Sequence, residues 1–277
     1  MNPRIDLHTH SNCSDGTLAP AALVALAARR QVELLALTDH DTAAGCDEAR
    51  AACETHGIRF VPGVELSCQW LGREIHIIGL DLDIAHAPFI AHCAAVLALR
   101  RQRIGAMAER LSRAGLPGEE LAAQALAAAA PTRAHLARAL CYRGLAASVQ
   151  AAFDRWLKRG QPGYVAACWP PLAIAVHCIA AAGGAAVLAH PHRYPLSNGV
   201  LRELLADFKA AGGVALELSL AGMGPADADR LATLARRFDL AGSIGSDFHE
   251  PGLPWRPLGR FAKLPDRITP IVALLGR

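Results

Sequence analysis

Imidazole and carboxylate side chains recur where the apolar runs of this sequence end. The first run carries His8 and His10 two residues apart, with Asp15 shortly after, and the last run ends in Asp247 and His249. Residues two apart on a strand point to the same face, so each pair presents two donor atoms from one rigid segment. Paired donors of this kind suit the coordination of a divalent metal ion.

The runs between these two supply further donors. "TDHD" contains His40, "PGVEL" contains Glu65, and His76 lies near the middle of the next run. Burying so many unpaired polar groups would be costly, and only a cluster of metal ions could engage all of them. Imidazoles and carboxylates without thiolates suit Mn²⁺, Fe²⁺ or Zn²⁺ rather than Ca²⁺. We therefore predict a metal cluster with the ligands His8, His10, Asp15, His40, Glu65, His76, His190, Asp247 and His249.

The elements that must position these residues alternate along the chain. We expect strands at 4–10, 32–40, 58–68, 73–82, 184–190, 213–220 and 241–249. Between and after them we expect helices at 19–31, 43–57, 86–114, 171–182, 199–211, 225–238 and near 268–275. This alternation is typical of a (β/α) barrel or a doubly wound sheet. In both folds functional side chains gather at the carboxyl ends of the strands.

Residues 100–165 break the alternation, because they are rich in Ala, Arg and Leu and lack strand signals. We interpret them as an inserted helical, substrate-binding subdomain, with 1–99 and 166–277 forming the barrel. Within the insert, "PTRAHLARAL" starts a helix with Arg133 and His135 in its first turn, which is a favourable place for an anion. Lys158 and Arg159 end another helix, where they either bind substrate or interact with the helix dipole.

Composition limits the classes of function. The chain has 277 residues, of which 52% are hydrophobic, and a formal net charge of +3. This excess is compatible with an anionic substrate but too small for a nucleic-acid-coating surface. The eight cysteines form no C-x-x-C motif, as expected for reduced thiols. The longest apolar stretch, 121–130, is too short to span a bilayer. We expect a soluble cytoplasmic protein with no secretory signal and no obligate protein partner.

The order of these motifs, HxH…D, TDHD, GxE, H, AHP and SDxH, resembles the PHP (polymerase and histidinol phosphatase) family across the chain outside the insert. The resemblance implies a distorted (β/α)7 barrel with three divalent ions, most often Mn²⁺. It implies one ion held by His8, His10, Glu65 and Asp247, a second held by Glu65, His76 and His190, and a third held by Asp15, His40 and His249. Glu65 would bridge the first two ions.

The insert with "TRAH" and "LKRG" resembles a stand-alone subgroup that removes the 3′-phosphate from nucleoside 3′,5′-bisphosphates and includes 5′-to-3′ exoribonucleases acting on short RNA. We expect catalytic roles for Glu65 and Arg133. His192 would contact the substrate or protonate the leaving oxygen, and Ser246 would hydrogen-bond a phosphate. Glu217 matches no ligand position, so we expect it to support a ligand.

Four other functions remain open at this point. The main alternative is a histidinol-phosphate phosphatase, whose cationic substrate Lys158 and Arg159 would repel. A proofreading domain would need a polymerase, and none follows in the sequence. A C–N amidohydrolase would need a different ligand spacing. A non-catalytic metal-binding regulatory module is the alternative from outside the enzymes.

Overall fold

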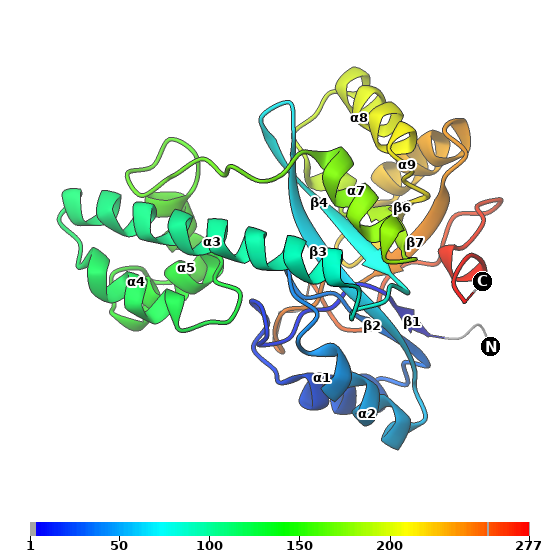
Figure 1. Cartoon of the computed structure of the whole chain (residues 1–277), viewed down its shortest axis with the longest axis horizontal. Coiled ribbons are helices and arrows are strands. Elements are labelled where there is room, and N and C mark those ends of the chain that lie inside the picture. Colours follow the sequence, from blue (N-terminus) through cyan, green and yellow to red (C-terminus); the bar gives the residue numbers. More distant parts are fainter. Residues whose placement is uncertain (1–3, 254, 277) are drawn as a thin grey trace.

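Seven strands form one sheet in the order β1 to β7, and the sheet curls into a nearly closed barrel (Figure 1). The computed structural model describes residues 4–253 and 255–276. The two edges of the sheet meet where Leu7 N donates to Ile244 O over 3.1 Å and Asp247 N donates to His8 O over 2.9 Å. The strands are Ile5–Asp6 (β1), Leu34–Leu37 (β2), Arg59–Trp70 (β3), Arg73–Leu80 (β4), Ala185–Leu188 (β5), Ala215–Leu220 (β6) and Ala241–Gly245 (β7). The predicted seven-stranded barrel is confirmed.

Strand β4 runs against both of its neighbours, while the other pairs are parallel. The reversal takes place at Leu71 and Gly72, which have φ values of 46° and 71° and close a tight hairpin between β3 and β4. Because β3 continues to Trp70, Glu65 lies within the strand rather than at its end. His76 lies opposite Ser67 in this hairpin, so it reaches the barrel mouth from the middle of its strand.

Small and aliphatic side chains fill the barrel interior below the mouth. The cluster is built from one or two residues of each of the strands β2 to β7, with Leu7 directly after β1, Ala189 directly after β5 and Ile271 from the C-terminal segment. Side chains of this size allow a barrel of few strands to close around a packed interior. The members are Leu7, Leu34, Ala36, Val61, Ile78, Leu80, Val187, Ala189, Ala215, Ala241 and Ile271.

Helices cover the outside of the barrel in two groups (Figure 1). Helices Pro20–Arg29 (α1) and Cys46–His56 (α2) pack together beside β2 and β3. Helices Leu172–Ala181 (α7), Asn198–Ala210 (α8) and Pro225–Arg237 (α9) cover the opposite side. Each of these helices turns an apolar stripe inward, as the positions Leu201, Leu204, Leu205 and Phe208 of α8 illustrate.

A helical lobe projects from the barrel beside its mouth (Figure 1). It is entered by the long helix Ala87–Arg113 (α3), which begins against the barrel, and continues with Gly118–Leu126 (α4), Arg133–Tyr142 (α5) and Val149–Ala152 (α6). A π-helical turn at Phe153–Leu157 follows. Met107, Leu111, Leu140 and Leu157 belong to an apolar cluster of the lobe's own.

The prediction of a helix near 268–275 is wrong. Thr269 accepts a hydrogen bond from Gly242 N over 2.8 Å, which keeps the chain extended beside β7. Only a short 3₁₀ turn follows, at Ile271–Ala273, and Ile271 enters the barrel interior. The apolar spacing in this segment therefore reflects packing against the barrel rather than a helical face. In the described residues, no helix combines the length and apolar character needed to cross a bilayer.

Candidate metal centre and anion pocket

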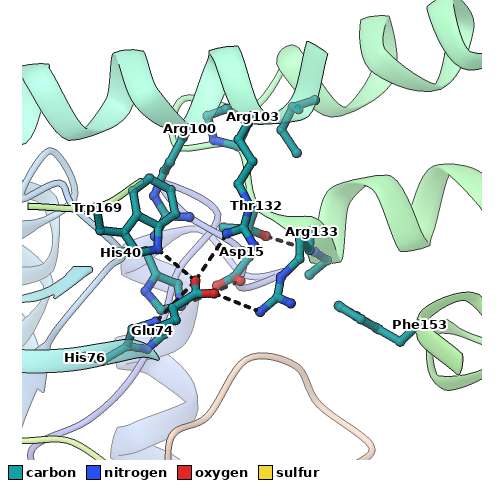
Figure 2. A pocket seen from close by; sticks show the side chains of 13 residues that line it. Asp15, His40, Glu74, His76, Arg100, Arg103, Thr132, Arg133, Phe153 and Trp169 are labelled. Atoms are coloured by element: carbon teal, nitrogen blue, oxygen red, sulfur yellow. Dashed lines mark hydrogen bonds and ion pairs between the residues drawn. The ribbon is translucent and has the colours of Figure 1, made fainter. Parts of the chain in front are cut away.

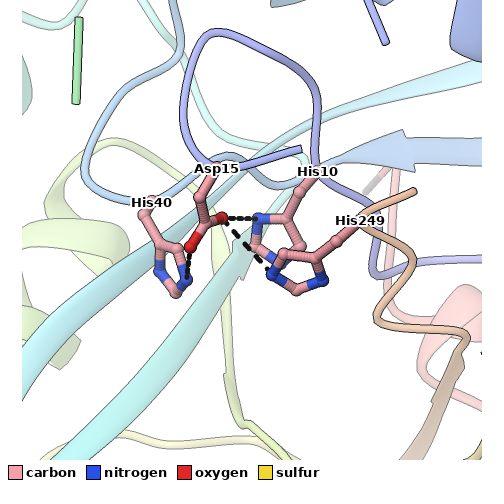
Figure 3. Close-up of side chains that lie close together, drawn as sticks. All are labelled: His10, Asp15, His40 and His249. Atoms are coloured by element: carbon pink, nitrogen blue, oxygen red, sulfur yellow. Dashed lines mark ion pairs between the residues drawn. The ribbon is translucent and has the colours of Figure 1, made fainter. Parts of the chain in front are cut away.

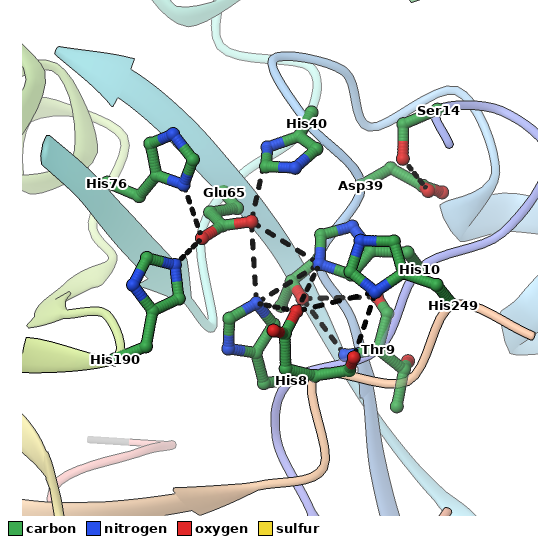
Figure 4. Close-up of polar contacts among 12 residues, drawn as sticks. His8, Thr9, His10, Ser14, Asp39, His40, Glu65, His76, His190 and His249 are labelled. Carbon is green, nitrogen blue, oxygen red and sulfur yellow. Dashed lines mark hydrogen bonds and ion pairs between the residues drawn. The ribbon is translucent and has the colours of Figure 1, made fainter. Parts of the chain in front are cut away.

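Three side chains from β3 and the segment after β1 bring their donor atoms into one small space at the barrel mouth. His8 Nε2 and His10 Nε2 are 3.1 Å apart, and Glu65 Oε2 lies 3.4 and 3.3 Å from them. Asp247 Oδ1 lies 3.4 and 3.3 Å from the same two nitrogens. Atoms that share an ion at about 2.1 Å are themselves roughly 3–3.5 Å apart. These spacings suit a common ion (Figure 4).

The carboxylate of Glu65 is shared with three more imidazoles. Its Oε1 lies 3.0 Å from His76 Nδ1 and 3.0 Å from His190 Nε2, and its Oε2 lies 3.1 Å from His40 Nδ1. Figure 4 shows Glu65 at the centre of this ring of side chains. With only 1% of its surface exposed, this carboxylate has little access to water and faces five imidazoles.

A third group forms around Asp15, in the loop that follows β1 (Figure 3). Its carboxylate lies 3.3 Å from His249 Nε2, 3.8 Å from His40 Nε2 and 4.0 Å from His10 Nδ1. The loops after β1, β2 and β7 supply these residues. The arrangement follows from parallel strands, whose carboxyl ends lie on the same rim of the barrel.

Several buried polar atoms at the mouth have no hydrogen-bond partner among residues 4–253 and 255–276: His10 Nδ1, Asp15 Oδ1, His40 Nδ1 and His190 Nδ1. His40 Nδ1 is near Glu65, but its orientation gives no hydrogen bond. Buried polar atoms are normally satisfied, so unpaired ones in a cluster need a partner of another kind. Divalent cations fit this donor set of imidazoles and carboxylates, and the side-chain clusters are able to hold metal.

Mutual attraction shifts the protonation of the cluster. Burial alone would raise the pKa of the Glu65 carboxyl, but the facing imidazoles, first among them His40, hold it well below its usual range. Burial would lower the pKa of His10, yet its hydrogen bonds with Asp247 and Glu65 raise it to about 9. In the same way, against the effect of burial, the Glu65 carboxylate raises the pKa of His76 to about 10. Without metal, part of the cluster is therefore protonated at neutral pH.

Glu217 of β6 contacts two of the histidines, one through its imidazole and one through its backbone. Its Oε1 lies 2.9 Å from His8 Nδ1, and its Oε2 accepts a hydrogen bond from His190 N over 2.6 Å. His190 has φ 31°, a left-handed conformation that costs a non-glycine residue of order 1–3 kcal/mol. The hydrogen bond to Glu217 helps to hold this backbone in place, so the expected supporting position of Glu217 agrees with the structure.

A pocket opens from the centre toward the helical lobe (Figure 2). Arg103 on α3 and Arg133 at the start of α5 both face Glu74 of β4, at 3.3 and 3.5 Å. Trp169 Nε1 donates to the same carboxylate over 3.0 Å. Burial would raise the pKa of Glu74, but its hydrogen bond with His76 and the two guanidiniums hold it well below its usual range.

Arg103, which lines this pocket, has one donor without a partner among the described residues. Its Nε donates to Val165 O over 3.1 Å, and its Nη1 contacts Glu74. Its Nη2 is buried and has no partner within the described ranges. A buried guanidinium N–H without an acceptor is costly in the empty pocket and favourable once an anion supplies an oxygen. The pocket is therefore suited to bind a phosphate close to the metal centre.

The predicted substrate-binding residues differ in where the structure places them. Arg133 lines the pocket, whereas His135 closes the start of α5, with its Nδ1 accepting from Thr132 N over 3.0 Å. Lys158 pairs with Asp154 on the surface, and neither it nor its exposed neighbour Arg159 lines the pocket.

Two further predicted residues lie on the barrel rim. Ser246 is fully buried, and its Oγ lies 3.5 Å from His8 O, to which it donates, so its hydroxyl has a partner in the backbone. His192 is half-buried after β5, and burial together with the adjacent Arg193 lowers its pKa to about 4. A pKa this low favours the neutral imidazole at pH 7.

Sequence reasoning missed Arg103, Glu74 and Trp169. A signal for Arg103 was present in "RRQR", because Arg100 and Arg103 are three residues apart and share a helix face. Arg100 is buried against Asp41 and Ser67, at 2.6 and 2.7 Å, and so anchors α3 to the barrel beside the mouth. No local pattern distinguishes Glu74 or Trp169 from ordinary surface residues.

A barrel whose mouth is lined by imidazoles and carboxylates is typical of metal-dependent hydrolases. Comparisons with known proteins place the chain in one such family. The PHP domain family matches residues 6–165. The chain is 44% identical over 263 residues to the 5′-3′ exoribonuclease Rnm of Escherichia coli, covering 94% of this chain and 89% of that protein. It is 39% identical over 269 residues to the 3′,5′-nucleoside bisphosphate phosphatase of Chromobacterium violaceum, covering 96% and 94%.

Solved structures give the same result. A Chromobacterium violaceum protein described as an amidohydrolase, with bound sulfate and no metal, superimposes with a TM-score of 0.92 at 38% identity, covering 98% of this chain and 95% of that one. A Bifidobacterium adolescentis protein, provisionally described as a metal-dependent phosphoesterase, has a TM-score of 0.82 at 29% identity, with coverage of 99% and 95%. This chain belongs to the PHP domain family.

Proposed function

We propose that this protein is a metal-dependent phosphoric ester hydrolase that removes the 3′-phosphate from nucleoside 3′,5′-bisphosphates and trims short RNA from its 5′ end. The observation that carries the proposal is the position of the cationic pocket directly beside the metal centre, where His40, His76 and Asp15 line both. A substrate with two phosphates can occupy both sites at once. The names of the bacterial relatives support the same two activities.

In this proposal three divalent ions, Mn²⁺ first and Fe²⁺ or Zn²⁺ as alternatives, occupy the centre. His8, His10, Glu65 and Asp247 hold the first, and Asp15, His40 and His249 hold the third. The second is held by His76 and His190 together with Glu65, whose two oxygens face different imidazoles. Bound divalent ions lower the pKa of water and neutralise phosphoryl oxygens as charge moves to the leaving group.

The helical lobe, within residues 100–165, supplies the selectivity. Arg133 and Arg103 bind the 5′-phosphate, and Glu74 holds both guanidiniums in place before the substrate arrives. His192 contacts the substrate as a neutral imidazole. Water attacks the phosphorus, the bond from phosphorus to the 3′-oxygen breaks, and a proton lost by the water replaces phosphorus on the 3′-oxygen, which leaves as a hydroxyl. A terminal phosphate then leaves as orthophosphate, whereas an internal one remains as the 5′-phosphate of the shortened RNA and releases a nucleoside 5′-monophosphate.

A substrate panel tests this function. The protein with Mn²⁺ is incubated with adenosine 3′,5′-bisphosphate, 3′-AMP, 5′-AMP and histidinol phosphate, and the release of phosphate is followed. We expect a clear preference for the bisphosphate, with AMP as product, because only this substrate offers phosphates to both sites. Equal rates on 3′-AMP would contradict the 5′-phosphate site. Preference for histidinol phosphate would favour that phosphatase, and no metal-dependent release at all would favour a regulatory module.

Metal uptake is expected to release protons. In the metal-free protein, the pKa values of His10 and His76 are raised to about 9 and about 10, so both imidazoles are protonated at pH 7. These charged forms stabilise the metal-free fold below the ordinary histidine pKa of about 6.5, and this stabilisation is lost as pH rises through 9 to 10. An imidazole must lose this proton before it can bind a metal ion, so the affinity for metal depends on pH with the opposite sign.

The apparent affinity for Mn²⁺ should therefore rise with pH up to about 9–10. Titration calorimetry at pH 7.5 in two buffers with different ionisation enthalpies measures the released protons directly. A binding enthalpy that does not depend on the buffer would contradict the assignment of protonated ligands.

A further inference from the structure

A second cationic surface lies on the part of the mouth formed by the loops after β5, β6 and β7. We call Arg193, Trp255 and Arg256 the β5–β7 rim. Arg193 follows β5, and Trp255 and Arg256 lie in the loop after β7. The backbone oxygen of Trp255 approaches Gly222, in the loop after β6, closely enough to lie 3.3 Å from the position of an added Cβ. The pocket facing the lobe includes none of these residues.

Both arginines of the rim are attached to the metal centre through Asp247. The Arg193 guanidinium pairs with Asp247 Oδ2, and Arg256 Nη1 lies 3.1 Å from the same oxygen. Arg256 Nη1 also lies 3.4 Å from His249 Nδ1. Asp247 Oδ1 faces His8 and His10 instead. The two guanidiniums therefore lie at the edge of the metal centre.

The single negative charge of Asp247 cannot neutralise both guanidiniums, and its carboxylate cannot accept from all of their donors. Two cations share one carboxylate oxygen, and each guanidinium offers five N–H groups. In the part of the chain that the structure describes, only the Nη1 groups contact a partner. The side chains of Arg193 and Arg256 are 27% and 28% exposed, so the remaining donors can reach a ligand from solution.

Positive charge continues on the surface next to Arg256, and the same loop carries an exposed aromatic residue. A hollow beside Arg256 is also lined by Arg30 and Arg260, with Glu250 as its carboxylate. Trp255 is 59% exposed, unlike most large apolar side chains of the described residues. Trp255 directly precedes Arg256 in the chain, so one loop carries both an exposed aromatic ring and a guanidinium. Aromatic rings that stack on bases and arginines that contact the backbone are the combination that binds single-stranded nucleic acid.

We propose that the β5–β7 rim binds the nucleotide on the 3′ side of the scissile phosphate when the substrate is RNA. This inference rests on the proposed function. The lobe pocket would hold the 5′-phosphate, the centre would hold the scissile phosphate, and the chain would continue past Asp247. Trp255 would stack on the next base, with Arg193 and Arg256 beside the phosphate. A bisphosphate ends at the scissile phosphate and would not reach Trp255.

The two substrate lengths separate this site from the rest of the enzyme. Steady-state kinetics with Mn²⁺ are measured on a 5′-phosphorylated RNA trinucleotide and on adenosine 3′,5′-bisphosphate, for wild type and Trp255→Ala. We expect kcat/KM on the trinucleotide to fall about tenfold, mainly through KM, because one base loses its stacking partner. Activity on the bisphosphate should stay within about twofold of wild type.

Two further variants make the result specific. Trp255→Phe keeps an aromatic face and should retain most of the activity on the trinucleotide. Tyr142→Ala removes an 84% exposed ring from the lobe and should leave the activity on both substrates unchanged. Equal loss on both substrates in Trp255→Ala, or no loss on either, would overturn this inference while leaving the proposed function intact. Wild-type protein that is inactive on the bisphosphate would overturn both.

Discussion

Glu65→Gln is expected to lower the turnover of adenosine 3′,5′-bisphosphate by roughly a thousandfold, the largest effect of any single substitution we consider. The reason is the number of groups that depend on this one carboxylate. Oε1 faces His76 and His190, and Oε2 faces His8, His10 and His40, all within 3.0–3.4 Å. An amide of the same shape provides one neutral oxygen and one N–H₂ group. The N–H₂ group can neither accept a hydrogen bond nor bind a metal ion as a carboxylate oxygen does.

Metal content distinguishes this explanation from a general loss of folding. The purified Glu65→Gln variant should contain less metal than wild type by elemental analysis, while its circular dichroism spectrum stays native. Glu54→Gln makes the same chemical change at an exposed position on α2 and serves as the matched control. Near-normal turnover with full metal occupancy in Glu65→Gln would refute the shared role of this carboxylate.

Arg133→Ala is expected to reduce kcat/KM for the bisphosphate by about a hundredfold, because a charge-assisted contact to the 5′-phosphate is lost in a partly buried pocket. The effect should be much smaller for 3′-AMP, which has no 5′-phosphate. The ratio of the two values of kcat/KM is therefore the measurement that identifies what Arg133 binds. Arg133→Lys keeps the charge but not the planar guanidinium. Its kcat/KM for the bisphosphate should therefore lie between the values for wild type and Arg133→Ala.

The lobe offers a suitable control for this substitution. Arg113 lies at the end of α3 with 75% of its side chain exposed and pairs only with Glu109 in the described structure, so Arg113→Ala should leave both substrates unaffected. An equal decrease on the bisphosphate and on 3′-AMP in Arg133→Ala would show that Arg133 acts on the metal centre or on the fold. In that case the 5′-phosphate would have to bind elsewhere.

Much of the fold and of the centre could be predicted from the sequence. The strand-and-helix alternation predicts the barrel, and the spacing of His8 and His10 requires them to share one face. Because parallel strands present their carboxyl ends on one rim, His40, Asp247 and His249 could be predicted to meet these two without knowledge of any distance. The Thr132 start of α5 was also predictable, since capping depends on only three or four neighbouring residues.

Tertiary structure alone decided what the local patterns left open. Only packing turned Arg103 of α3 toward Glu74 of β4, because helical spacing defines a shared face but not the element that meets it. The antiparallel direction of β4 placed His76 at the mouth from mid-strand, and contact with β7 and the barrel interior replaced the helix expected at the C-terminus. Lys158 and Arg159 lie away from the pocket because their turn is oriented by the lobe's core. Short-range residue preferences thus determined the strands and the imidazoles and carboxylates at their ends, whereas long-range packing determined which charges surround them.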